Sequence, residues 1–453
     1  MPQENEKLRE ITAGLCENIS DAYTIQSRHY ENASVKRGLR NEDGTGVLIG
    51  ITQIGSVQGY YIEDGEKMPM HGHLYYRGID VADIVDNHQK NKTFGYEEVA
   101  YLLLLGKLPN LRQREEFNNI LSQARPLPPG FFEDMILKVS GSNVMNVLSR
   151  CVLALYTYDD NPEDNSVENL IYQSISLIAR FPGIVTTAYA AKRHQYDNQS
   201  LFVHNPRSDL SISENFLRML RPSKEYTPEE ARLLDLMMIL HAEHGGGNNS
   251  TFTCRSLSST GTDTYSAIAG AVSSLKGPLH GGANGKVADM LRDIRQNVGD
   301  CTDDDEVSAY LRRILNREVN DRSGKIYGLG HAVYTMSDPR ALLIKKYARQ
   351  IAEEKGSLEE FELIQTVERL GTQVLMEKRK NGLPCCANVD LYSGFVYSLL
   401  GIPQELYTPI FATARIAGWC AHRIEEITTC GRIMRPAYKA PLRKLNYVPL
   451  EKR

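Results

Sequence analysis

The chain has 453 residues, a hydrophobic content of 42% and a formal net charge of −4. Such a length allows one large core or two domains, and the composition is ordinary for a globular protein. The isoelectric point near 6.3 leaves no excess of basic residues for a phosphate backbone or an anionic bilayer. We therefore expect neither nucleic acid nor a membrane as a partner.

The N-terminal segment and the cysteines bear on the cellular compartment. The first seventeen residues, "MPQENEKLREITAGLCE", contain four glutamates and match neither a secretory signal nor an arginine-rich transit peptide. No later run approaches the ~20 apolar residues that span a bilayer. The eight cysteines form no C-x-x-C pair, which argues against a disulfide framework and a zinc ribbon. The sequence predicts a reduced, cytoplasmic protein.

Strand patterns are confined to residues 46–79, where glycines interrupt short β-branched and aromatic runs. This pattern predicts one or two hairpins. Helical periodicity follows in chain order in "YEEVAYLLLLGKLP", "NLIYQSISLIARFPG", "TPEEARLLDLMMILHAEHGGG", "DTYSAIAGAVSSLKGP" and "DPRALLIKKYARQIAEEKG", most of them closed by glycine or proline. The predicted class is all-α with a small N-terminal β-hairpin region.

One helix has a complete set of start signals. Thr227 is the expected N-cap, Pro228 the first helical residue and Glu230 the partner in a capping box. Three glycines from Gly245 are expected to end this helix. Further along, the acidic cluster "GDCTDDDE" at 299–306 is expected to be a solvated turn between helices.

Three segments place a histidine beside glycines: "HAEHGGGNNS", "GPLHGGAN" and "GLGHAVYTMSDPRA". Glycine has no Cβ, so a ligand can approach the backbone closely there. His280 precedes the helical run "ANGKVADMLRDI", and a helix N-terminus disfavours an imidazolium. A neutral histidine in this place can donate a hydrogen bond to a carbonyl oxygen that gains charge. The alternative is a turn histidine bonded to backbone.

His241 and His244 form an H-x-x-H spacing, which raises the possibility of a metal site. The sequence lacks H-E-x-x-H and a nearby third ligand, so this interpretation is weak. A second hypothesis is that His244 contacts a substrate at the end of its helix. A third is that it stabilises the helix C-terminus as a cation.

Two acidic residues precede predicted helices. In "SDPRALLIKK", Asp338 is the expected N-cap and Arg340 lies in the first turn, where a guanidinium and free N–H groups suit a carboxylate or phosphate. The alternative is an ordinary capped helix. Asp390 precedes the short run that ends at Gly401 and Pro403, and its simplest interpretation is an N-cap.

The joint occurrence of these features, in this order, resembles the citrate synthase family. The matching segments are "HAEHGGGNNSTF", "SLKGPLHGGAN", "YGLGHAVYTMSDPRA", "NVDLYSGFVYSLLGIP", "ATARIAGWCAH" and "RIMRP", with "LYYRGIDVADIV" and "EEVAYLLLLGKLP" nearer the N-terminus. The resemblance covers roughly residues 45–440. Two departures, "CCANVD" for the usual "YPNVD" and Ala332 where many relatives have arginine, could alter contacts with coenzyme A.

The resemblance implies a transferase of the tricarboxylic acid cycle, an acyltransferase that condenses acetyl-CoA with oxaloacetate and water to give citrate and CoA. It implies that Asp390 removes the methyl proton, that His280 stabilises the enol and that His331 polarises the oxaloacetate carbonyl. It also implies a set of groups that bind oxaloacetate: His244, Arg340, Arg415 and Arg435. No metal and no redox cofactor is expected, because the thioester supplies the activation.

The resemblance also implies a two-domain helical fold, with a large domain from residues 1–282 and 389–453 and a small domain from 283–388. The active unit would be a homodimer whose sites are shared, with Arg435 completing the partner's site. A 2-methylcitrate synthase using propionyl-CoA is an open alternative, since one methylene discriminates by only ~1 to 3 kcal/mol. Two alternatives belong to other functional classes. One is a metallohydrolase built on His241 and His244, and the other is a metabolite-binding paralogue without turnover.

Overall fold

The computed structural model describes residues 23–31, 33–378, 384–429, 431–441 and 444–452, together with residues 6, 9, 12, 13 and 16. The chain divides into two compact units. One comprises Met1–Ile49 with Arg435–Arg453, and the other comprises Gly50–Met434. The domain boundaries that we predicted near 282 and 388 both fall inside the second unit and stay a prediction.

An isolated antiparallel bridge joins Arg40 to Gly46 in the first unit. The helices of this unit whose bounds are described are short. They are α3 (Ser27–Glu31), η1 (Arg37–Leu39) and η5 (Leu450–Lys452). The Arg37 guanidinium lies over the Tyr30 ring, 4.3 Å from its centroid.

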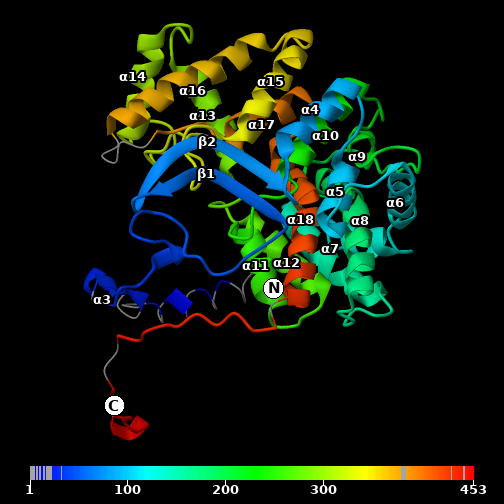
Figure 1. The fold of residues 1–453 in the computed structure, drawn as a ribbon, viewed down its shortest axis with the longest axis horizontal. Helices are drawn as coiled ribbons and strands as arrows, with labels where there is room; N and C mark the ends of the chain where they lie inside the picture. Colours follow the sequence, from blue (N-terminus) through cyan, green and yellow to red (C-terminus); the bar gives the residue numbers. More distant parts are fainter. Residues whose placement is uncertain are drawn as a thin grey trace. The chain divides into compact units, whose positions relative to one another are not determined.

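The second unit begins with the predicted hairpin. Strand β1 (Gly55–Glu63) pairs antiparallel with β2 (Glu66–Tyr76), which pairs with the short β3 (Ile79–Asp80). The two-residue turn, Asp64-Gly65, has positive φ at both positions, as a tight hairpin turn requires. Figure 1 shows the two long strands running beside the helices that carry the rest of the unit.

The rest of the second unit is helical among the described residues, which confirms the all-α class. Before residue 280 the helices are α4 (Val81–Asn91), α5 (Tyr96–Leu105), α6 (Leu111–Ala124), η2 (Phe132–Leu137), α7 (Val144–Leu155), η3 (Tyr156–Tyr158), α8 (Val167–Tyr196), α9 (Ile212–Leu220), α10 (Pro228–His241), α11 (Asn249–Ser258) and α12 (Thr264–Lys276). After it come α13 (Ala283–Asn297), α14 (Asp304–Leu315), α15 (Pro339–Glu354), α16 (Leu358–Lys378), α17 (Val389–Leu399), η4 (Gln404–Leu406) and α18 (Tyr407–Thr429).

Helix α18 is the centre of the helical core. It packs against α5, α8, α10, α11 and α12 (Figure 1). Its Trp419 and Arg415 are both fully buried, so this helix brings a large apolar ring and a cation into the interior. A buried cation must find a partner or a ligand, which makes α18 a structural element of the site as well.

The predicted helix starts are confirmed. Thr227 caps α10, and Glu230 completes the capping box. Asp338 caps α15 by accepting a hydrogen bond from the Arg340 backbone N–H. Each cap satisfies N–H groups that the first helical turn leaves without a partner.

Two predicted helix ends are wrong. Helix α8 continues through Pro182 to Tyr196, because buried packing against α7 and α18 outweighs the loss of one backbone hydrogen bond. Helix α10 ends at His241, four residues before Gly245. His244 therefore lies in the following loop, and His241 and His244 do not share a helical face.

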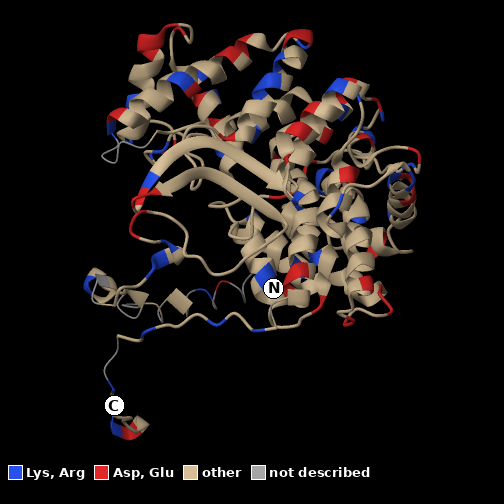
Figure 2. Ribbon diagram, viewed as in Figure 1, with Lys and Arg blue, Asp and Glu red and all other residues tan. Residues whose placement is uncertain are grey.

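Charge is distributed unevenly over the second unit. Acidic and basic residues lie side by side on α14, α15 and α16, whereas the long strands carry charge mainly near their turn (Figure 2). The acidic cluster at 299–306 begins as the expected turn, but its last three residues, from Asp304, form the first turn of α14. None of the helices in the described part of the chain is long and apolar enough to cross a bilayer.

Candidate active site

Two of the predicted histidines meet beside the strands of the hairpin. His244 and His331 pack edge to face, with ring centroids 5.2 Å apart. The Tyr334 ring stacks on His331 at 4.6 Å, and its hydroxyl lies 3.3 Å from His244 Nε2. The Arg340 guanidinium stands over the same tyrosine ring, 5.7 Å from its centroid. The four side chains form one cluster of polar and aromatic groups.

The backbone fixes the tautomer of His331. Its Nδ1 accepts hydrogen bonds from the backbone N–H groups of Val333 and Tyr334, at 3.0 and 3.1 Å. An accepting Nδ1 has no proton, so the ring is neutral and its proton is on Nε2. His331 thus presents one N–H donor away from its own loop.

His280 is fixed in the opposite tautomer. Its Nε2 accepts a hydrogen bond from the Ser250 backbone N–H at 3.2 Å and lies 3.0 Å from the Ser250 hydroxyl. Trp419 Nε1 donates to that hydroxyl at 3.2 Å. Burial, and next the charge of Arg415, lower the pKa of His280 to about 4. The ring is neutral, as predicted, with its proton on Nδ1, but the cause is burial and Arg415.

Asp390 lies in the first turn of α17, and Asn388 is the N-cap, since its side chain accepts from the Asp390 backbone N–H at 3.0 Å. The simplest sequence interpretation, Asp390 as N-cap, is therefore wrong. The Asp390 carboxyl group therefore does not cap the helix. Burial raises its pKa to about 6, with the Arg340 charge lowering it and Asp338 raising it.

The loop of His331 and the helix of Asp390 are tied together. Gly330 N–H donates to the Cys386 carbonyl at 2.8 Å, and the Asn388 side chain donates to the Gly330 carbonyl at 2.9 Å. Asp338 adds a second link, because it accepts from the Val389 backbone N–H at 3.2 Å. These links fix His331 and the Asp390 carboxyl group in one framework.

The two buried arginines differ in their pairing. Arg340 makes a two-point ion pair with Asp338, with N–O distances of 3.0 and 2.8 Å. Arg415 uses its Nε to donate to the His241 carbonyl at 2.6 Å, and its two terminal nitrogens have no hydrogen-bond partner among the described residues. Burial lowers the pKa of Arg415 to about 10, so it remains charged at pH 7. A buried, charged and unsatisfied fork is suited to an anionic ligand.

Burial and nearby positive charges also lower the pKa values of His241 and His244. They hold the pKa of His244 and of His241 well below the usual range, with Arg340 the next cause after burial in both. Both ring nitrogens of His241 are buried and have no partner among the described residues. A neutral ring can both donate and accept. The idea of His244 as a cation at a helix end is therefore wrong.

The structure thus gathers His244, His331 and Arg340 around the Tyr334 ring and links Asp390 to them through Asp338 and residues 386–388. His280 belongs to the same electrostatic environment through Arg415. Arg435 lies in the other compact unit, in exposed chain, and its role stays a prediction. Sequence reasoning missed Tyr334, although its place three residues after His331 in a glycine-flanked segment was a usable signal.

No group of three or more His, Cys, Asp or Glu side chains is placed to hold a metal ion in the described part of the chain. The geometry around His241 and His244 therefore gives no support to the metallohydrolase alternative.

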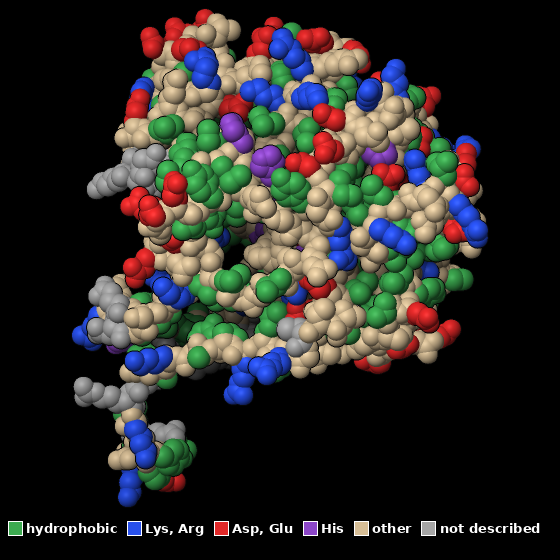
Figure 3. All heavy atoms as spheres, viewed as in Figure 1, with side chains coloured by type: hydrophobic (Ala, Val, Ile, Leu, Met, Phe, Trp, Pro, Cys, Tyr) green, Lys and Arg blue, Asp and Glu red, His purple; other side chains and the backbone are tan. Residues whose placement is uncertain are grey.

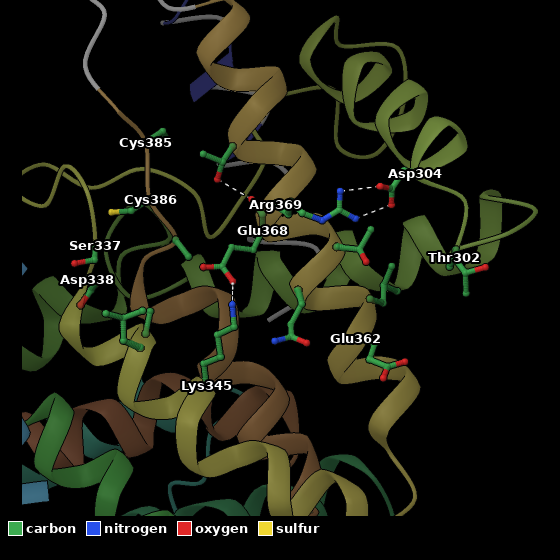
Figure 4. A pocket seen from close by; sticks show the side chains of 18 of the residues that line it. Thr302, Asp304, Ser337, Asp338, Lys345, Glu362, Glu368, Arg369, Cys385 and Cys386 are labelled. Atoms are coloured by element: carbon green, nitrogen blue, oxygen red, sulfur yellow. Dashed lines mark hydrogen bonds and ion pairs between the residues drawn. The ribbon is translucent and has the colours of Figure 1, made fainter. Parts of the chain in front are cut away.

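A separate depression of about 1100 Å³ lies among α14, α15, α16 and residues 385–387. None of the seven predicted site residues lines it. Lys345 pairs with Glu368 at 2.7 Å and Arg369 with Asp304 at 2.6 Å across it (Figure 4). Elsewhere, hydrophobic side chains gather at the surface over the β1–β2 hairpin (Figure 3), where Ile62 is 56% exposed.

Comparison with known proteins identifies the family of the chain. The family description "Citrate synthase, C-terminal domain" matches residues 43–437. Citrate synthase from Deinococcus radiodurans is 37% identical over 362 residues, which are 79% of this chain and 88% of that protein. A 2-methylcitrate synthase from Shewanella oneidensis is 32% identical over 364 residues, 80% of this chain and 87% of that protein.

Comparison with solved structures shows the same fold in citrate synthases. The solved ternary complex of citrate synthase from Thermoplasma acidophilum with carboxymethyl coenzyme A and oxaloacetate has a TM-score of 0.74 and 25% identity. The match covers 92% of this chain and 99% of that one. With the family description spanning most of the sequence, the predicted family, fold and citrate synthase function are supported, and the chain belongs to the citrate synthase family.

Proposed function

We propose that this chain condenses acetyl-CoA with oxaloacetate, and that the seven predicted residues form its site. The observation that supports this most is the pair of neutral histidines with protons on opposite nitrogens, His280 on Nδ1 and His331 on Nε2. A condensation between two carbonyl compounds needs two donors, one for each carbonyl oxygen. A nearby carboxyl group with a raised pKa supplies the base.

The first step is removal of a proton from the acetyl methyl group. Asp390 accepts this proton while His280 donates a hydrogen bond to the thioester oxygen, so that charge on the enol oxygen is stabilised. A base is most effective when its pKa lies near the operating pH, and the pKa of Asp390, about 6, meets that requirement.

The second step is attack of the enol carbon on oxaloacetate. His331 polarises the ketone through its Nε2 proton, and one such donor is commonly worth ~3 kcal/mol. Arg340 and Arg415 bind the carboxylates, and His244 donates a further hydrogen bond to the substrate. A guanidinium stays charged when buried and binds a carboxylate at two points, which lysine cannot do. Hydrolysis of citryl-CoA then releases citrate and CoA.

Several finer features belong to the same proposal. The reaction class is that of an acyltransferase which converts the acyl group into an alkyl group. The chain acts in the cytoplasm as a homodimer with Arg435 completing the partner's site. Its large domain comprises 1–282 and 389–453, and its small domain comprises 283–388.

The direct test is thiol release. Purified protein is mixed with acetyl-CoA and a thiol-reactive dye, with and without oxaloacetate, and CoA should appear only when both substrates are present. EDTA should leave the rate unchanged, whereas loss with EDTA and return with zinc would favour the metal alternative. Faster release from propionyl-CoA than from acetyl-CoA would assign the chain to the 2-methylcitrate synthases. No release with either would favour a binding paralogue.

A further inference from the structure

The loop that carries His244 lies in register along one face of α18. Arg415 Nε donates to the His241 carbonyl at 2.6 Å, and His422 Nε2 lies 2.9 Å from Glu243 Oε1. Between them, a Cβ on Gly418 would lie 2.6 Å from Glu243 Oε2. Positions 415, 418 and 422 share one helical face. Residues 241–243 therefore follow that face for two turns, and only glycine fits in the middle.

The Glu243 carboxylate is fully buried and is held at one oxygen. Oε1 accepts from the Gly245 backbone N–H at 2.5 Å and from His422. Burial acts to raise the pKa of Glu243, but His422 and Arg415 outweigh it and the pKa is lowered. The group is an ionised anion one residue before His244.

The contacts of His422 have a fixed direction for a geometric reason. Arg255 donates from NH1 to His422 Nδ1 at 2.9 Å, and a guanidinium has no acceptor. The proton of His422 is therefore on Nε2, where it donates to Glu243. Arg255 is held in turn by Glu425 at 2.7 Å and by Glu426 at 2.8 Å. A buried chain of four links thus runs from α11 and α18 to the loop of His244.

We propose that Glu243 and His422 are positioning residues for the oxaloacetate end of the site. They fix the loop between α10 and α11 against α18, so that His244 and the unsatisfied fork of Arg415 converge on one dianion. This inference rests on the proposed function. It adds that a histidine and a glutamate outside the predicted site control affinity for oxaloacetate more than affinity for acetyl-CoA, because His280 is held by two other side chains of the same helices, Ser250 of α11 and Trp419 of α18.

The test is steady-state kinetics of thiol release with each substrate varied in turn. His422→Leu leaves a buried carboxylate without its partner and should raise KM for oxaloacetate about tenfold or more, with KM for acetyl-CoA changed less than about twofold. His422→Gln, whose amide can donate to Glu243 and accept from Arg255, should restore most of the affinity. Glu243→Asp shortens the side chain by one methylene and should also raise KM for oxaloacetate, which keeps the test usable if His422→Leu does not fold.

A control of the same chemistry is the pair of buried His88 and half-buried Glu98, whose Nε2 and Oε1 atoms are 3.3 Å apart. It lies on α4 and α5, outside the site. His88→Leu should lower the melting temperature without moving either KM. If His422→Leu and Glu243→Asp lower only the melting temperature, as the control does, the positioning role is wrong. An inactive wild-type chain would instead contradict the proposed function.

Discussion

At the scale of single residues, the site depends on where protons are held. His280 and His331 differ in tautomer because backbone N–H groups occupy opposite ring nitrogens. Neither ring needs to change its charge to donate a hydrogen bond. Asp390 is the group in the set with a pKa near neutrality, about 6, whereas that of His280 is about 4.

The difference between the pKa values of Asp390 and His280 predicts how activity falls at acid pH. Below pH ~6 Asp390 takes up a proton and can no longer act as a base, so kcat/KM for acetyl-CoA should fall about tenfold per pH unit. His280 stays neutral down to about pH 4 and adds no second step in this range. The measurement is initial thiol release between pH 4.5 and 8. Asp390→Asn should lose turnover at every pH, and a profile flat to pH 5 would remove Asp390 from the role of base.

At the scale of elements, the hairpin supports the loop of His331. The Thr335 hydroxyl donates to the Gly59 carbonyl, and the Met70 backbone N–H donates to the Thr335 hydroxyl at 3.1 Å. The Ser337 hydroxyl accepts from the Gly72 backbone N–H, also at 3.1 Å. The strands therefore act as a backing surface for residues 331–337, and the two glycines permit the close approach.

Gly72→Ala should disturb this contact. A Cβ at Gly72 would lie under 3.0 Å from the Ser337 carbonyl oxygen and from the Tyr334 ring, so strand or loop must move. We expect a loss of about 1–3 kcal/mol in the free energy of unfolding, typical of overpacking, and a fall in kcat of about tenfold or more. Denaturant unfolding and thiol release measure the two effects. Gly50→Ala, with nothing within 4 Å of its Cβ, is the control, and equal behaviour of the two variants would contradict the backing role.

Elements were predictable where the signal is local. The caps Thr227 and Asp338 each act within one turn of chain, and both predictions are confirmed. The predicted helix end at Pro182 is wrong, because the packing that keeps α8 continuous comes from segments far away in sequence. Contacts distant in sequence also explain why the N-cap prediction for Asp390 is wrong. Whether Asn388 or Asp390 caps α17 depends on the paired segments around Gly330, which periodicity cannot reveal.

At the scale of the whole molecule, the site could be predicted from the sequence only through resemblance. Its groups come from the loop after α10, the turn between α12 and α13, the loop before α15 and the first turn of that helix, the start of α17 and the middle of α18. No spacing rule connects positions so far apart. What only the structure could add is the partner set: Tyr334 beside His331, Ser250 behind His280, and His422 behind Glu243.

The shared-site dimer is tested by mixing subunits. Random exchange of equal amounts of Arg435→Ala and Asp390→Asn chains makes about half of the dimers mixed, and each mixed dimer holds one site with both groups and one with neither. About a quarter of wild-type activity should return if the sites act independently. Native mass spectrometry confirms the exchange. Mixed dimers without recovered activity would place Arg435 in its own subunit's site.

The place of α18 in the chain has a consequence for synthesis on the ribosome. Arg415 and His422 lie near the end of the second unit, so a nascent chain lacks Arg415, one of the two buried arginines that we propose bind oxaloacetate, until α18 has emerged. A ligand stabilises only a state that binds it. Metabolite levels in the cell can therefore stabilise the finished protein against unfolding, but they give no help to the growing chain, which must fold the helices before α18 unaided.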